Sequence, residues 1–274
     1  MEKAFFYFLT SLLFIYCNPN KEKKTLPVFK NLVWGDEFNY EGKINQSLWH
    51  LQTIPIDNGS WANNELQHYT ENVKNCFVKD GMLNIVALKE EIEIYNSLKN
   101  YSSARLNSKF DFKYGRIDVK AKLPSSIGTW PAIWTLGSNI DEMGNYLGEN
   151  KGETPWPYCG EIDIMEQNGW DKKDLYNVLH FHNTATNKKD EMKKISSISN
   201  SNKFNVYSLV WTKEKIYWLL NDTITFEHKN MDVMPFDNNH YLLLNLAIGG
   251  VLGGKVPEDF REERMIIDYV RIFQ

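Results

Sequence analysis

Short stretches in which apolar and polar residues alternate run along most of this chain. Between residues 116 and 123 every charged residue falls on one face of an extended segment, and the apolar residues share the other face. Two further apolar runs, residues 216–220 and 223–226, flank Asn221 and Asp222, a two-residue turn able to reach positive φ. No long stretch has the periodicity of an amphipathic helix. The pattern therefore predicts an all-β protein.

Three carboxylates stand close together in one of the apolar runs. Glu161, Asp163 and Glu166 lie within residues 160–166. On a flat strand Glu161 and Asp163 share one face and Glu166 points to the other. A β-bulge at Ile164 and Met165 would add one residue and return Glu166 to the face of the other two. Burying three like charges is costly, so chains seldom group them without using them.

This spacing suits the chemistry of a retaining glycosidase, which needs two carboxyl groups roughly 5–5.5 Å apart. Glu161 would attack the anomeric carbon, while Glu166 would protonate the leaving oxygen and then activate water. Neighbouring negative charge raises the pKa of Glu166 in the required direction. Asp163 could hold the orientation and charge state of Glu161. A solvated edge strand would explain the spacing alone, but the apolar residues between the acids look like a face packed on a core.

The sequence around these acids resembles the active-site signature of glycoside hydrolase family 16, in the bulged form of its laminarinase-like members. The likeness covers about residues 32–274, and the matching positions include 61–67, 103–106, 112–117, 128–137, 211, 235–237, 244–250 and 268–271. It implies a β-jelly-roll sandwich of the concanavalin A-like kind, with an open concave cleft for a polysaccharide. It also implies hydrolysis of internal β-1,3 or mixed β-1,3/1,4 glucan linkages, with Glu161 as nucleophile, Glu166 as acid/base and Asp163 as the assisting residue.

The resemblance implies further residues that contact the substrate. These are Trp130, Trp134, Asn63, Arg105 and His180. Indole rings stack on the apolar faces of sugars, and Gly128 and Pro131 suggest an exposed loop entering a strand around the two tryptophans.

Catalysis by two carboxylates needs no metal or other cofactor. Members of the family often carry a structural calcium ion, however, on the convex face. By resemblance its ligands here would be Asp268 and the backbone oxygens of Glu37 and Gly81.

Two departures from the family pattern lie near the acids. Residues 177–183 replace a more usual Gly-Thr-x-His-Trp/Tyr-Gly-Gly, and Gln167 and Asn168 follow the last acid where apolar residues are common. A galactan-active or transglycosylating member of the family therefore stays open, as does a glycan-binding module without catalysis. All three acids are present, which favours an enzyme. His180 and His182 alternate onto one strand face and could ligate a metal as in cupin barrels, but no Glu follows at the required place.

The composition of the chain argues against nucleic acid as a binding partner. A net charge of −4 and a sequence pI near 5.9 leave no basic footprint, so we do not expect nucleic acid to bind. The length of 274 residues suits one large β domain, which we expect to be a monomer. Of the 9 tryptophans, Trp34, Trp49, Trp211 and Trp218 lie in strand-like runs and are expected in the core.

The N-terminal segment differs from the rest. An uncharged, largely apolar run, residues 4–16, follows Lys3 and is shorter than the ~20 residues of a membrane-spanning helix. Cys17 and the polar residues after it resemble the lipidated Cys and tether of a bacterial lipoprotein, although Tyr16 stands where a small residue is expected. We expect export, either as a cell-envelope lipoprotein anchored to the membrane through Cys17 or as a secreted protein.

The chain thus divides into three expected parts, with a signal peptide at 1–17, a tether at 18–27 and a catalytic domain at 28–274. Within the domain, the polar residues 138–159 should wall one end of the cleft. The Asn- and Lys-rich residues 185–203 look like another surface excursion, to which no chemistry can be assigned.

Two cysteines remain in the expected mature domain. Cys76 and Cys159 could pair in an oxidising compartment, but the sequence gives no distance between them. A buried free thiol is the plainer interpretation of Cys159.

Overall fold

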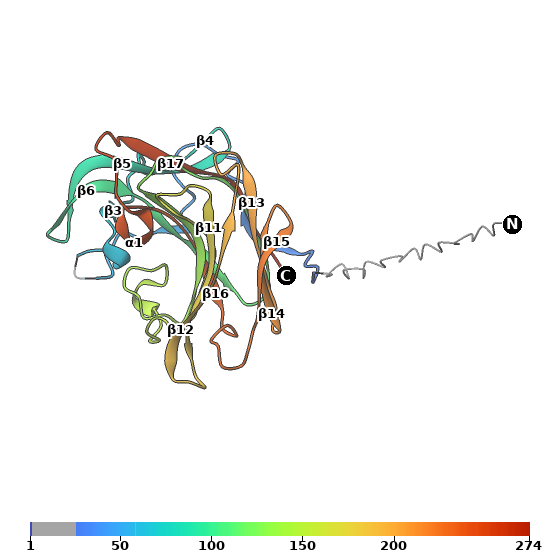
Figure 1. Cartoon of the computed structure of the whole chain (residues 1–274). Helices are drawn as coiled ribbons and strands as arrows, with labels where there is room; N and C mark the ends of the chain where they lie inside the picture. Colours follow the sequence, from blue (N-terminus) through green and yellow to red (C-terminus); the bar gives the residue numbers. More distant parts are fainter. Residues whose placement is uncertain (2–25, 58) are drawn as a thin grey trace.

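Two β-sheets stacked as curved layers form the protein, as the computed structural model shows (Figure 1). The structure describes residues 1, 26–57 and 59–274. Within these ranges nearly all strand pairs are antiparallel, and β3 with β6 is a parallel pair. The helical segments there are single short turns, namely η1 (Ala62–Asn64), η2 (Gly148–Asn150) and α1 (Gly250–Gly253). The expected all-β jelly-roll sandwich is confirmed.

One layer, here called the outer sheet, has ten strands among the described residues. Eight follow in the order β15 (Thr223–Lys229), β14 (Lys215–Leu220), β13 (Asn205–Trp211), β8 (Gly115–Lys122), β17 (Glu262–Phe273), β5 (Met82–Ile94), β6 (Ser97–Ser103) and β3 (Gln67–Tyr69). In addition, β1 (Leu32–Asp36) pairs with β17, and β4 (Cys76–Lys79) pairs with β5.

The other layer, here called the cleft sheet, has seven strands in the described chain. Their order is β12 (Lys188–Ser197), β11 (Asp174–Asn183), β10 (Glu161–Gln167), β9 (Thr129–Gly137), β16 (His240–Ile248), β7 (Arg105–Phe112) and β2 (Trp49–Leu51). The three expected acids belong to β10, near the middle of this sheet.

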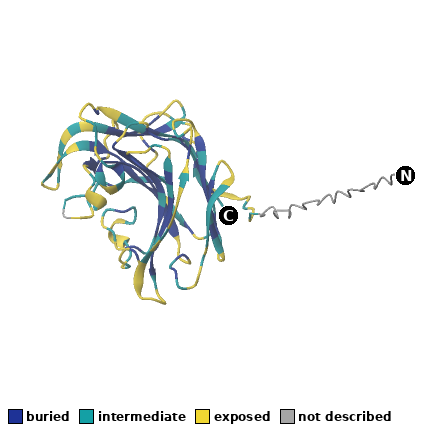
Figure 2. Cartoon of the chain, in the orientation of Figure 1, coloured by how far each residue is buried: buried dark blue, intermediate teal, exposed yellow. Residues whose placement is uncertain are grey.

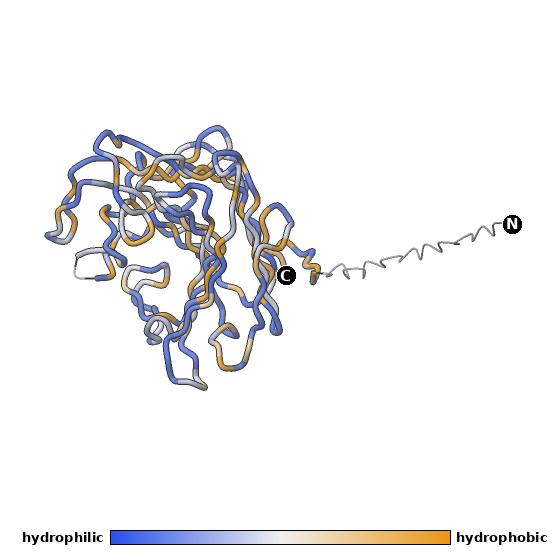
Figure 3. Tube along the Cα trace, viewed as in Figure 1, coloured by the Kyte–Doolittle hydropathy of each residue, from blue (hydrophilic) through white to orange (hydrophobic). Residues whose placement is uncertain are grey.

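The core fills the space between the two sheets (Figure 2). Strand β8 shows how the alternating sequence produces this arrangement. Its residues Ile117, Val119 and Ala121 are buried, whereas the charged residues between them are partly exposed. Figure 3 shows hydrophilic and hydrophobic residues interspersed along the whole trace. Apolar side chains on one face of each strand therefore leave water together, which is the main favourable term in folding.

The expected positions of aromatic and turn residues agree with the structure. Trp49, Trp211 and Trp218 are fully buried, while Trp34 is only half-buried and packs against the core. Asn221 and Asp222 have φ of 49° and 61° and join β14 to β15 in the expected two-residue hairpin.

The loop before β10 has a small apolar cluster of its own. Leu136, Ile140, Cys159, Tyr241 and Leu243 pack together on the side of the cleft sheet that faces away from the main core. This cluster holds residues 138–159 against the sheet.

The assignment of residues 185–203 as a surface excursion is wrong. Residues 188–197 form β12, which pairs with β11 over its whole length. The polar composition hid the strand because it lies at the edge of the sheet and packs little side-chain surface on the core. It is visible as the long hairpin at the bottom of Figure 1.

Cys76 and Cys159 are both buried and free, so the structure contains no bridge between them. The expected signal segment and Cys17 lie outside the described residues, and these expectations stay predictions. Across the described ranges, no helix is long and apolar enough to span a membrane.

Candidate active site

The expected β-bulge is present in β10. Asp163 pairs with Val178 of β11, but Glu166 pairs with Tyr176, so three steps on β10 oppose two on β11. The register against β9 also shifts between Asp163 and Met165. The extra residue rephases the strand, as predicted.

Because of the bulge, the acids and the apolar residues of β10 separate onto two faces. Ile162, Ile164 and Met165 all belong to the core cluster. Glu161, Asp163 and Glu166 all line a cleft of about 560 Å³ on the opposite face. The alternative of a solvated edge strand is excluded, since β10 has a neighbour on each side and Asp163 is only 3% exposed.

Every residue that we expected to contact the substrate lines the same cleft. These residues are Asn63, Arg105, Trp130, Trp134 and His180. The two tryptophans lie within β9 itself rather than on an exposed loop, and Trp130 is only 8% exposed. The expectation that residues 138–159 wall the cleft is also confirmed, because Glu142 and Trp156 contribute to its lining.

Tryptophan N–H groups hold the two outer acids. Trp156 Nε1 donates to Glu161 Oε2 at 2.8 Å, and Trp130 Nε1 donates to Glu166 Oε1 at 2.9 Å. A donor aimed at a carboxylate favours its charged form and restricts its rotation. Each glutamate therefore has a defined orientation in the cleft.

Asp163 lies beside Glu161 and shares His180 with it. His180 Nε2 is 3.6 Å from Asp163 Oδ2 and 3.9 Å from Glu161 Oε1. Asp163 Oδ2 is buried and has no hydrogen-bond partner among the described residues. A protonated Asp163 could use this atom as a donor toward its neighbours.

Burial raises the pKa of all three carboxyl groups. For Asp163 the pKa lies well above its usual value because of burial and then the charge of Glu161. Burial also raises the pKa of Glu166 to about 7, although the bond from Trp130 opposes the rise. Burial and the charge of Glu166 raise the pKa of Glu161 in the same direction. The site as a whole therefore keeps protons at a pH where free carboxyl groups have lost them.

Trp156 and the edge strand β12 are features of the site that sequence reasoning missed. Lys189 Nζ stacks 3.6 Å above the Trp156 ring centre. Glu191 Oε2 is 3.6 Å from His180 Nδ1, and Lys193 Nζ is 2.9 Å from Glu191 Oε1. Lys189, Glu191 and Lys193 lie at alternate positions of β12 and line the cleft, but the charged Asp190 between them leaves no alternation of polar and apolar residues that would have marked the strand.

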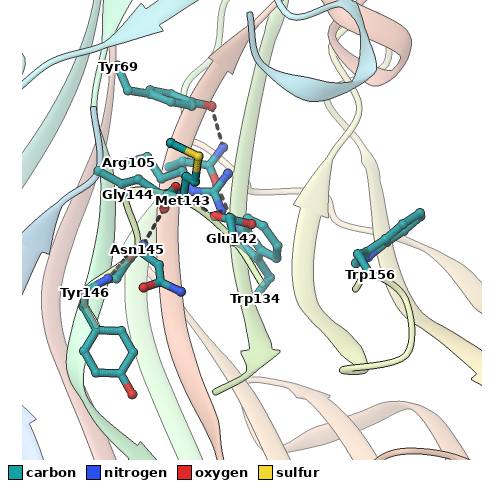
Figure 4. Close-up of polar contacts among 12 residues, drawn as sticks. Tyr69, Arg105, Trp134, Glu142, Met143, Gly144, Asn145, Tyr146 and Trp156 are labelled. Atoms are coloured by element: carbon teal, nitrogen blue, oxygen red, sulfur yellow. Dashed lines mark hydrogen bonds and ion pairs between the residues drawn. The ribbon is translucent and has the colours of Figure 1, made fainter. Parts of the chain in front are cut away.

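A buried ion pair anchors the opposite wall (Figure 4). Arg105 Nη2 donates to Glu142 Oε1 at 2.6 Å, and both side chains are about 90% buried or more. The guanidinium lies 5.5 Å from the Trp61 ring centre and 4.9 Å from that of Trp134. Gln52 also donates to Glu142 at 2.6 Å. These contacts fix the loop that carries Glu142 to the cleft sheet.

The cupin-like metal pair of His180 and His182 is not formed. His182 Nε2 lies 3.0 Å from Asn187 Oδ1, and its ring stacks on Tyr158 at 3.9 Å. The candidate ligands that come together in the described chain are Glu161, Asp163 and His180, which belong to the carboxylate site itself.

The expected calcium ligands come from neighbouring strands. Glu37 follows the last residue of β1 and Gly81 precedes the first residue of β5, and both strands pair with β17, which contains Asp268. Asp268 Oδ2 lies 2.6 Å from Lys120 Nζ. The donor set fits calcium only if the ion displaces this ammonium group, so the calcium site stays a prediction.

A family model, a curated relative and solved structures all relate this chain to the same family of glycoside hydrolases. The model of Glycosyl hydrolases family 16 matches residues 64–271. The chain is 33% identical to a β-glucanase of Rhodothermus marinus over 262 residues, which cover 89% of this chain and 85% of the relative. The solved catalytic domain LamAcat of Zobellia galactanivorans has a TM-score of 0.88 and 52% identity, covering 90% of this chain and 98% of that one. A LamA variant of that organism in complex with laminaritriose and laminaritetraose has a TM-score of 0.88 and 51% identity, covering 90% and 100%.

The raised pKa of Asp163 predicts how stability depends on pH. The folded state keeps a proton that the unfolded chain loses near pH 4, so this group stabilises the fold at low pH and loses that contribution as pH rises. At pH 8, the free energy of unfolding of Asp163→Asn should exceed that of wild type by about 1 kcal/mol or more, so the variant is the more stable protein. At pH 4 this difference should shrink. Urea unfolding at both pH values measures this. An equal difference at both values would contradict it.

Calcium binding has a similarly direct measurement. Millimolar calcium should raise the melting temperature relative to a chelator, because a ligand bound only to the folded state stabilises it. Asp268→Asn should remove the rise, whereas Asp237→Asn, an acid elsewhere in the chain, should keep it. Identical wild-type melting curves with and without calcium would exclude the site.

Proposed function

Because this chain belongs to glycosyl hydrolases family 16 and is a glycoside hydrolase, we propose that it cleaves internal β-1,3 or mixed β-1,3/1,4 linkages of a β-glucan with retention of configuration. The observation that carries this proposal is the bulged strand β10. It presents Glu161, Asp163 and Glu166 in one cleft, where burial keeps the proton of Glu166 available near neutral pH.

In the first step Glu161 attacks the anomeric carbon and forms a covalent glycosyl ester. Glu166 gives its proton to the leaving oxygen at the same time. Burial supports this role, because it keeps the Glu166 proton available near neutral pH. Trp130 holds the carboxyl group in place through its indole N–H.

In the second step Glu166, now ionised, takes a proton from water, and the water oxygen attacks the anomeric carbon. The ester bond to Glu161 breaks and the carboxylate is restored. Asp163 assists as the group that keeps a proton, since it is the most buried of the three acids. The protonated carboxyl group of Asp163 can donate a hydrogen bond toward Glu161. This bond and the one from Trp156 both favour the ionised form of Glu161.

The chemistry of the cleft supports a neutral glucan as substrate. Six carboxyl-bearing residues line it, namely Glu65, Glu142, Glu161, Asp163, Glu166 and Glu191. Against them stand Arg105, Lys189 and Lys193, of which Arg105 is paired with Glu142 and Lys193 with Glu191. A sulfated galactan would meet unfavourable charge here. The relatives named as glucanases, and the solved complex with laminari-oligosaccharides, point to the same class of substrate.

Two alternatives use the same site. A transglycosylase has the same two glutamates and differs in how well an acceptor sugar competes with water. A glycan-binding module would have no use for the three acids, whose burial without chemistry is costly.

The proposal is tested by incubating the protein with laminarin, mixed-linkage β-glucan, agarose and carrageenan. Oligosaccharides should appear from the first two polymers and persist in a chelator, since the chemistry uses no metal. Glu161→Gln and Glu166→Gln should each lower turnover of these polymers at least ~10³-fold with a melting temperature no lower than that of wild type. Glu149→Gln, on the η2 turn outside the cleft lining, is the matched control and should keep wild-type turnover.

Products from agarose or carrageenan but not from the glucans would keep the mechanism and change the substrate. Near-wild-type turnover in either active-site variant would overturn the assignment. Binding of laminarin without any product would favour the binding module.

A further inference from the structure

The bulge that turns Glu166 toward the cleft is held from the opposite face, by side chains in the core between the sheets. The carbonyl oxygens of Asp163 and Ile164 lie where the register of β10 shifts. The indole Nε1 of Trp218 donates to Asp163 O at 2.8 Å, and the amide Nδ2 of Asn177 donates to Ile164 O at 2.7 Å. Both carbonyl groups at the register shift therefore have a side-chain donor.

Asn177 is a polar residue in an otherwise apolar stripe. On the same side of β11, Leu175, Leu179 and Phe181 belong to the core cluster. Asn177 is 6% exposed, and it stands at the position of the first glycine in the Gly-Thr-x-His-Trp/Tyr-Gly-Gly pattern that is more usual in the family. A buried amide is costly unless its hydrogen bonds are made. Its bond to Ile164 therefore gives a physical reason for this departure.

Thr225 fixes which way the Asn177 amide points. The hydroxyl of Thr225, on β15, donates a hydrogen bond to Asn177 Oδ1 at 2.9 Å. The carbonyl oxygen of Trp218 is farther from the same hydroxyl, at 3.3 Å. With its oxygen held by this hydroxyl, the amide of Asn177 presents its N–H to Ile164. The outer sheet thus supports the bulge of the cleft sheet through two side chains of the β14–β15 hairpin.

We propose that Asn177, oriented by Thr225, is a positioning residue that keeps β10 in its bulged register and so aims Glu166 at the leaving oxygen. This inference rests on the proposed role of Glu166 as acid/base. Without the extra residue Glu166 would face the core, because side chains alternate along a strand. The bond from Asn177 reaches Ile164 O in the bulged register, so it favours that register over a regular strand.

The test uses Asn177→Leu, which keeps the side-chain volume and removes the donor. Its kcat on laminarin should fall about 100-fold with KM within about 2-fold, because the substrate site is intact but the proton donor is misplaced. Asn84→Leu is the matched control. Asn84 is also 6% exposed and donates to a backbone carbonyl, Met82 O, at 3.1 Å on β5 of the outer sheet.

A second substrate separates positioning of Glu166 from a general loss of structure. A 2,4-dinitrophenyl β-laminaribioside has a leaving group that needs no protonation. Asn177→Leu should therefore release dinitrophenolate in a burst as fast as wild type, while Glu161 becomes glycosylated. The slow step is then attack by water, which needs Glu166 as base. Azide needs no base, so it should restore turnover and form a glycosyl azide.

Thr225→Val provides an independent variant, in case Asn177→Leu has a lowered melting temperature. It should show the same pattern with a smaller loss on laminarin. The proposal is overturned if these variants keep wild-type kcat, if the burst is lost with laminarin activity, or if Asn84→Leu loses as much. Glu166→Gln separates the two proposals. If Glu166→Gln shows the burst and the azide rescue but Asn177→Leu does not, only the positioning role of Asn177 fails. If Glu166→Gln stays active on laminarin, the proposed function fails.

Discussion

The hydrogen-bonding register of β10 is the constraint on which the site depends. A strand that alternated regularly from Glu161 would direct Glu166 into the apolar core, where an unpaired carboxylate is very costly. The extra residue at Ile164 and Met165 instead directs two consecutive apolar residues to the core and brings Glu166 to the cleft. The indole bonds of Trp130 and Trp156 act on a geometry that the bulge creates. The packing of Ile164 and Met165 in the core therefore determines which carboxyl groups reach the cleft face of β10.

The same arrangement explains why the site is electrostatically unfavourable in the resting protein. Burial raises the proton affinity of all three carboxyl groups, and in addition the charge of Glu166 raises that of Glu161 and the charge of Glu161 raises that of Asp163. The indoles of Trp130 and Trp156 donate hydrogen bonds to the two glutamates, and no lysine or arginine of the described chain is paired directly with any of the three acids. A strong ion pair there would lower the pKa of Glu166 and remove its proton near neutral pH. The site thus gives up some stability for function, as active sites often do.

Local signals in the sequence predicted an all-β chain, the bulge and the three acids, whereas the jelly-roll sandwich and the substrate contacts were expected from the resemblance to the family. Alternation marks the strands, and Ile162, Ile164 and Met165 mark the core face of β10. The structure also placed all five expected substrate contacts in the cleft. Trp156 and β12 escaped because their roles depend on tertiary contacts, as in the stacking of Lys189 on Trp156. The link from Asn177 to Ile164 joins residues 13 apart across two strands, and no local pattern reveals it.

The bulge brings Glu166 to the cleft face that Glu161 already occupies, and in this pair Glu161 is the proposed nucleophile of a double displacement. The most direct measurement is incubation of the protein with 2-deoxy-2-fluoro-β-laminaribiosyl fluoride, followed by mass spectrometry of the intact protein and its peptides. The fluorine at C2 slows both steps, and the good leaving group allows the first, so the covalent intermediate accumulates. We predict one added fluorolaminaribiosyl group, on Glu161. An adduct on Glu166 or Asp163, or substrate turnover without any adduct, would contradict the account.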